Sequence, residues 1–180
     1  MIFTMHGYDH FFIDVEKAFS SLINRYHAIV SKKEDKDFGQ YAVEITFSCS
    51  KLVLDLDRKD LQCKLVNLAN SQEFQVIQIL NLLHPEKEFV HKVNKEGESR
   101  QAVVSSLNFF SDSIEKYLIN AINGDFGWSE KYYQKEKEDT MLVKEVLKLD
   151  YGDEIQQKFW KGDLSWKNDM RLRLKKALNK

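Results

Sequence analysis

Four carboxylates are the side chains of this sequence best placed to do chemistry together. Glu44, Asp55, Asp57 and Asp60 alternate with apolar residues between positions 41 and 66. Alternation of period two is typical of strands with one buried face, so we expect the carboxylates on the opposite face. There they can hold a hard cation such as Mg²⁺, bind a basic protein, or stay solvated and ion-paired.

The same alternation predicts a three-stranded antiparallel meander and its register. Pairing Phe47 with Leu52, across a short turn at Cys49, places Asp55 directly opposite Glu44. Like charges opposite one another destabilise a sheet, so lysines, a cation or a basic partner should offset them. Which of the three supplies the compensation stays open.

The second hairpin of the meander pairs Leu56 with Leu61 and Leu54 with Cys63, with a turn at residues 58–59. Cys63 then points into the core while Cys49 lies at the first turn. We therefore expect no disulfide between the two cysteines.

Three other patterns contain the residue types of a functional site. His6 and His10 are spaced to share a helix face, but no third metal ligand accompanies them. The kinase-like tripeptide at residues 125–127 lacks every other kinase motif, so we expect a helix-ending turn there. The basic C-terminal helix could contact nucleic acid, but cations in a last turn also complement the helix dipole.

The elements around the meander follow from helical periodicity and capping signals. Apolar residues predict a helix over residues 9–31, and the Asn70/Glu73 pair predicts a capping box opening a second helix that ends before Pro85. Further helices are expected over residues 99–123, from Ser129 with a break within 134–139 as an alternative, over 153–162, and from Ser165. Residues 88–93 are a candidate short edge strand.

Composition places the chain among ordinary soluble proteins. Its 180 residues carry 27 basic and 28 acidic side chains, a net charge of -1, which gives no general case for a nucleic-acid partner. The sequence shows neither a signal peptide nor a run of about 18 apolar residues, so we expect a cytoplasmic protein without a membrane partner.

These observations predict an α+β fold in a single domain, 1–180. A small three- or four-stranded antiparallel sheet packs against helices over residues 1–70, and a helical part follows over 71–180. We expect no cofactor and no catalytic residue, because no reaction motif is present. The oligomeric state stays open.

The function that we predict is non-enzymatic protein binding. Its partner-binding residues would be Glu44, Asp55, Asp57 and Asp60, and its partner a basic protein steered by charge. This profile is similar to that of bacterial immunity proteins, which act as antitoxins against toxic nucleases, although no residue motif carries the similarity. The alternative is a metal-dependent phosphodiesterase or nuclease with Asp55, Asp57 and Glu44 as ligands.

Overall fold

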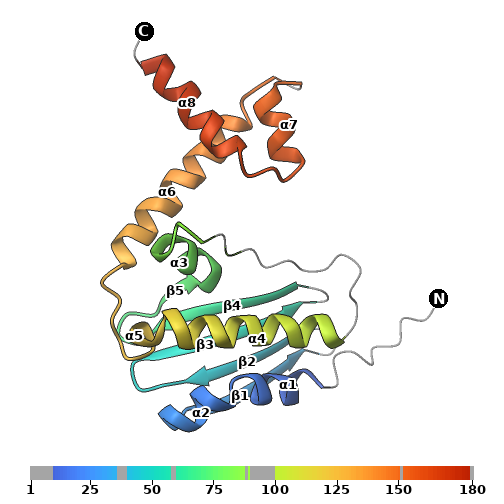
Figure 1. The fold of residues 1–180 in the computed structure, drawn as a ribbon, viewed down its shortest axis with the longest axis vertical. Coiled ribbons are helices and arrows are strands. Elements are labelled where there is room, and N and C mark those ends of the chain that lie inside the picture. Colours follow the sequence, from blue (N-terminus) through green and yellow to red (C-terminus); the bar gives the residue numbers. More distant parts are fainter. Residues whose placement is uncertain are drawn as a thin grey trace, which may run out of the picture. The chain divides into compact units, whose positions relative to one another are not determined.

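The computed structural model describes residues 10–35, 40–57, 60–87, 89, 100–150 and 152–178. These residues form an α+β structure with a five-stranded antiparallel sheet and eight helices (Figure 1). The chain divides into two compact units, residues 1–127 with the sheet and 128–180 with helices alone. That the chain is a single domain, 1–180, stays a prediction.

The sheet is a simple meander in which every strand pairs with its neighbour in the sequence. Its strands are β1 (Ile29–Asp35), β2 (Gln40–Thr46), β3 (Ser50–Asp57), β4 (Asp60–Asn67) and β5 (Gln72–Gln75). The expected three- or four-stranded sheet is therefore too small. β5 and the first residues of β1, up to Ser31, lie in segments predicted as helix.

The predicted helix over residues 9–31 is wrong beyond Tyr26. The structure has α1 (Phe11–Ala18) and α2 (Ser20–Tyr26), and His27 then adopts a left-handed backbone with φ of 48°. A left-handed residue ends a helix, and Ile29 begins β1 by pairing with Thr46. β-branched residues such as Ile29 and Val30 fit a strand as readily as a helix stripe, so pairing with β2 decided between them.

The predicted capping box at Asn70 is also wrong. Asn70 instead accepts a hydrogen bond from the backbone N–H of Gln72 at 3.1 Å, and Ser71 has a φ of 58°. This turn lets β5 pair with β4, with Phe74 opposite Leu65. The helix α3 (Val76–Leu83) begins only after that strand. Asn serves turns and helix caps equally well, so the local signal was ambiguous.

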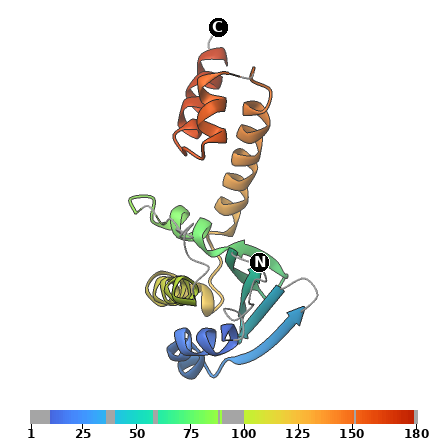
Figure 2. The same cartoon turned by 90° about the vertical axis from the view of Figure 1, so that its right-hand side faces the viewer.

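Helices of the first unit cover one face of the sheet, where its core lies. α4 (Arg100–Tyr117) and α1 lie on the same side of the strands (Figure 2). The buried side chains include Val15, Phe19 and Leu22 from the amino-terminal helices, Leu52, Leu54 and Leu65 from the sheet, and Leu107 and Ile114 from α4. Cys63 is buried there as predicted, Cys49 is exposed, and both thiols are free.

The predicted helix over residues 99–123 is interrupted near its end. α4 stops at Tyr117 and α5 (Ile119–Ile122) follows. Gly124 has a φ of 97°, which confirms its predicted place after the helix end. The buried hydroxyl of Ser50 on β3 donates to the carbonyl oxygen of Ile122 at 3.0 Å, which ties α5 to the sheet.

An ion pair between the buried Asp14 and the exposed Arg100 holds α1 to α4. Asp14 accepts two hydrogen bonds from Arg100, from Nε at 2.8 Å and from Nη2 at 2.7 Å. The Arg100 guanidinium lowers the pKa of Asp14 below its ordinary value. The sequence offered a signal for this contact, because Asp14 lies between the buried Phe11 and Val15 on the apolar stripe.

The second unit consists of α6 (Ser129–Val146), α7 (Glu154–Trp160) and α8 (Trp166–Leu178). Their small core contains Leu142, Val146, Ile155, Trp166 and Met170. Asp153 caps α7 by accepting from the N–H of Ile155 at 2.9 Å, so the predicted start of this helix is confirmed. α6 runs without interruption through residues 134–139, where a break was possible.

Candidate binding face of the sheet

The register of the carboxylate-bearing strands is partly as predicted. β3 and β4 pair Leu56 with Leu61 and Leu54 with Cys63, which confirms the second hairpin. The first hairpin is wrong by two residues, because Leu52 pairs with Ile45 and not with Phe47. A two-residue shift keeps every side chain on the same face, so the alternation alone could not exclude it.

The corrected register separates the two carboxylates that were expected to face each other. Glu44 lies opposite Val53, and Asp55 lies opposite Ala42. The two acids are diagonal neighbours on the same face and still repel weakly, since the Glu44 charge helps raise the pKa of Asp55.

Lysines from neighbouring strands interleave with the acids on this face, away from the core. We call the six residues the charged face: Lys33, Glu44, Lys51, Asp55, Lys64 and Glu73. Each of the five strands contributes at least one of them. The compensation that the sequence left open therefore comes in large part from the sheet itself.

The charged face consists of two ion-paired groups of opposite net charge. Glu44 lies 2.8 Å from Lys33 Nζ and 3.2 Å from Lys51 Nζ, so two cations surround one carboxylate. Lys64 Nζ lies 3.9 Å from Asp55 and 3.5 Å from Glu73, so two carboxylates share one cation. The first group is net positive and the second is net negative.

The pKa values of Glu44 and Asp55 are shifted in opposite directions in the two groups. The hydrogen bond from Lys33 lowers the pKa of Glu44, which is a well-compensated carboxylate. Burial raises the pKa of Asp55, and the charges of Glu73 and Glu44 raise it further against the attraction of Lys64. Asp55 is therefore a carboxylate whose negative charge the sheet compensates incompletely.

We call the positions Asp55, Asp57 and Asp60 the acidic end of the sheet. Asp57 and Asp60 pair with each other across β3 and β4. Their side chains, and residues 58–59, where a turn was expected, lie outside the described part of the structure. The backbone register places Asp57 two residues along β3 from Asp55.

The described residues contain no ligand set that supports a metal-ion site. No group of three or more His, Cys, Asp or Glu side chains in that part of the chain could hold an ion. His6 lies outside the described residues, and His10 is exposed immediately before α1. Asp125 accepts a hydrogen bond from the N–H of Gly127 at 3.1 Å, as expected for the turn predicted there.

The cations of the C-terminal helix are largely paired within their own unit. Lys167 contacts Asp139 at 2.6 Å, Arg171 contacts Glu138 at 2.9 Å, and Arg173 contacts Asp153 at 2.7 Å. Pairs of this kind reduce the positive charge that phosphate groups would meet. Lys175 and Lys176 are exposed, and Lys180 lies outside the described residues.

Every helix in the described residues is too short or too polar to cross a bilayer.

Comparison of the chain with protein-family models, with curated proteins and with solved structures found no match in any of the three.

Proposed function

We propose that this chain is a non-enzymatic protein-binding module that uses the acidic end of its sheet. The binding residues are Asp55, Asp57 and Asp60, with Glu44 at the border of the surface. The partner presents lysine or arginine side chains to them. In the most specific form of this proposal, the chain is an immunity protein and its partner is a basic, toxin-like protein.

The state of Asp55 is the observation that carries the proposal. Its side chain is 39% exposed, and among the described residues it forms an ion pair with Lys64 Nζ at 3.9 Å, which Glu73 shares. A carboxylate that is partly desolvated and incompletely paired costs stability in the free protein. A partner cation at this position would relieve that cost, so the same group favours binding.

The location of the acidic end also supports binding to a protein. Within the first unit, α1 and α4 lie on the opposite side of the sheet (Figure 2). A pleated surface with side chains from several strands offers a broad area for contact with another protein. The net-positive group around Glu44 lies directly beside Asp55 on the same face, because Lys33 and Asp55 both flank Ala42 across the strands.

The experiment is capture of the partner by the immobilised full chain. Extract of the source cells is passed over the wild-type chain, Asp55→Asn, Asp55→Lys and the control Glu136→Lys. Glu136 is an exposed acid on α6, so its reversal changes net charge equally but away from the charged face. Thermal unfolding of each variant establishes that it is folded.

We expect one basic protein to be retained by the wild type and by Glu136→Lys, in a salt-sensitive manner. Asp55→Asn should weaken capture and Asp55→Lys should abolish it while the protein stays folded. Retention by Asp55→Lys, equal loss with Glu136→Lys, or capture of acidic proteins alone would refute the assignment of this face. For the more specific form, the captured protein must be toxic to cells and lose toxicity when the wild-type chain is co-expressed.

A further inference from the structure

One tyrosine of the first unit lies between two lysine side chains. Tyr117 is the last residue of α4, and its hydroxyl accepts a hydrogen bond from Lys87 Nζ at 3.1 Å. Lys87 belongs to the segment after α3, whereas Lys116 belongs to the last turn of α4. Their ammonium groups lie 4.5 Å and 5.3 Å, respectively, from the centroid of the tyrosine ring. Two cations therefore lie beside one hydroxyl.

Two aromatic side chains hold the ring of Tyr117 in place. The centroid of the His84 ring lies 4.6 Å from that of Tyr117, and the Phe89 ring packs edge-on at 5.5 Å. Edge-on packing is a favourable arrangement of aromatic rings, so these contacts fix the position of the phenol. Tyr117 is nevertheless only half-buried, and its hydrogen bond with Lys87 lies at the exposed surface. A small molecule can therefore reach the hydroxyl.

The charges around this hydroxyl favour its ionised form. Glu86 Oε1 lies 4.0 Å from Lys87 Nζ and 3.5 Å from His84 Nδ1, so this carboxylate is divided between two groups. Lys116 has no ion pair within the described part of the chain. The hydrogen bond from Lys87 lowers the pKa of Tyr117 below its ordinary value, and Lys116 lowers it further against the opposing effect of burial.

The two lysines have two effects on the chemistry of Tyr117. Because the ionised oxygen of a tyrosine is its nucleophilic form, cations that favour ionisation increase the fraction of Tyr117 that can react at neutral pH. The same cations attract an anionic reagent to the hydroxyl and stabilise negative charge that develops during its attack. Lys87 and Lys116 therefore provide both an activated oxygen and a preference for anionic reagents.

We propose that Tyr117 is a covalent modification site for small anionic reagents with an electrophilic phosphorus or sulfur atom. The tyrosine oxygen attacks that atom and forms a new bond to it. The bond between that atom and its leaving group breaks, and the leaving group departs with the electron pair. The hydroxyl proton passes to solvent, and no atom is oxidised or reduced. Lys87 and Lys116 are positioning residues in this step. This site is independent of the proposed partner-binding face.

The test compares an anionic and a neutral probe on the full-length chain. Para-carboxybenzenesulfonyl fluoride and benzenesulfonyl fluoride transfer a sulfonyl group to tyrosine with loss of fluoride, and peptide mass spectrometry gives the rate at each tyrosine. Tyr26, whose ring packs edge-on against Phe47, is the reference that cancels the different intrinsic reactivities of the probes. We expect the ratio of the Tyr117 rate to the Tyr26 rate to be about fivefold higher for the anionic probe, as attraction between unit charges at short range in water predicts.

Three variants test the role of the cations. Lys87→Met and Lys116→Met each remove one charge but keep most of the side-chain length, so each should slow labelling of Tyr117 by about two- to fivefold. Lys135→Met removes the same charge at an exposed position on α6 and should leave this rate unchanged. The wild-type rate should level off at a lower pH than the ordinary tyrosine pKa of about 10 predicts, and Lys87→Met should move that pH upward.

The proposal is overturned if Tyr117 reacts no faster than Tyr26 with the anionic probe, or if Lys87→Met and Lys116→Met are labelled at the wild-type rate. Equal slowing by Lys135→Met would also overturn it, because net charge would then be the cause. Both lysines beside Tyr117 are exposed, so their variants are expected to fold, and the comparison of probes on the wild type stands without them. Acetyl phosphate distinguishes the reagents: phosphorylation of Tyr117 assigns the site to phosphorus donors, and labelling by sulfonyl fluorides alone assigns it to sulfur donors.

Discussion

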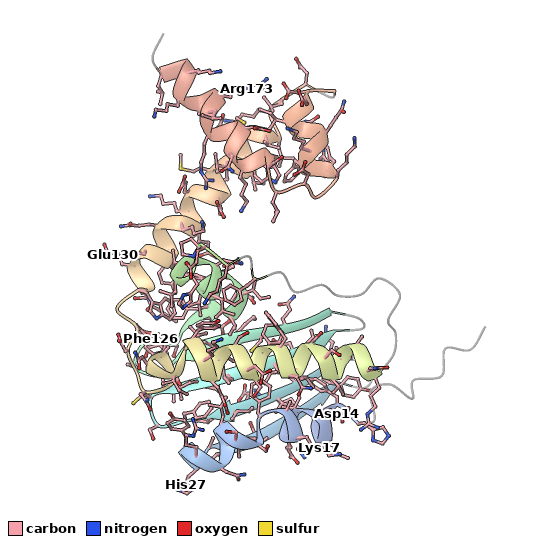
Figure 3. The ribbon with its side chains drawn as sticks, viewed as in Figure 1. Asp14, Lys17, His27, Phe126, Glu130 and Arg173 are labelled. Carbon is pink, nitrogen blue, oxygen red and sulfur yellow. The ribbon has the colours of Figure 1, made fainter. Side chains whose placement is uncertain are left out.

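The ion pair between α1 and α4, which is buried on its Asp14 side only, gives the sharpest test of how this fold is held together. Asp14 (Figure 3) has a side chain that is 5% exposed, whereas the side chain of Arg100 is 45% exposed. Asp14→Asn keeps one oxygen that can accept from Arg100, whereas Arg100→Ala removes both donors. The two variants differ in the group left behind, which is a buried carboxylate in one case and a hydrated guanidinium in the other.

The magnitudes follow from that asymmetry. A hydrogen bond to a charged group contributes about 1.5–3 kcal/mol net, and an unpaired buried charge raises the loss to about 3–5 kcal/mol. Asp14→Asn leaves Arg100 in contact with water, so we expect a loss of about 2 kcal/mol. Arg100→Ala strands the Asp14 charge, and we expect about 3 kcal/mol, at the low end because water already reaches that side of the pair.

The assay is urea unfolding of the full chain at pH 7 and at low pH. The pKa of Asp14 is lowered in the folded state, so its stabilising contribution is present above the ordinary aspartate pKa of about 3.9 and is lost as the pH falls below it. The Arg100→Ala penalty should therefore shrink at low pH, where Asp14 becomes neutral. Equal losses at pH 7, a larger loss for Asp14→Asn, or a penalty independent of pH would refute the reasoning.

Three more predictions concern other parts of the chain. Asp55→Asn should raise the melting temperature at pH 7 and have little effect below pH about 3.9, because burial raises the pKa of Asp55 and protonation removes the same penalty; a lower melting temperature at pH 7 would contradict it. Gly124→Ala should cost about 2 kcal/mol in urea unfolding, because φ is 97° and the new Cβ would lie 3.0 Å from Cys49 Cβ; Gly162→Ala, which has open space, is the control and should cost less. Arg171→Ala should cost about 0.5–1 kcal/mol and less at high salt, because its contacts with Glu138 and Asp139 are partly exposed; a loss that salt leaves unchanged would point to packing instead.

The sequence was sufficient to predict the strand periodicity and the face of the sheet on which each side chain lies. The alternation between positions 41 and 66 predicted three strands, the buried place of Cys63 and the β3–β4 register, because a one-residue slip would bury charges. Capping and glycine signals predicted the start of α7 at Asp153 and the helix end at Gly124. These are local signals, and they act within a few residues of where they are read.

Tertiary pairing decided what local signals left ambiguous. Ile29 and Val30 became part of β1, and Glu73 part of β5, because edge strands gain hydrogen bonds from β2 and β4 that no local pattern reveals. The register of the first hairpin differs from the predicted one by two residues, a shift that keeps every side chain on its face and that the alternation therefore cannot detect. As a result, Glu44 lies opposite Val53 and not opposite Asp55.

The sequence by itself determined that acids gather on one face of a sheet. Which of those acids keeps an incompletely compensated charge was decided only by the assembled strands, because ion pairing depends on distances between side chains far apart in the sequence. Lys33 on β1 forms an ion pair with Glu44, whereas Asp55 and Glu73 both contact the same cation, Lys64.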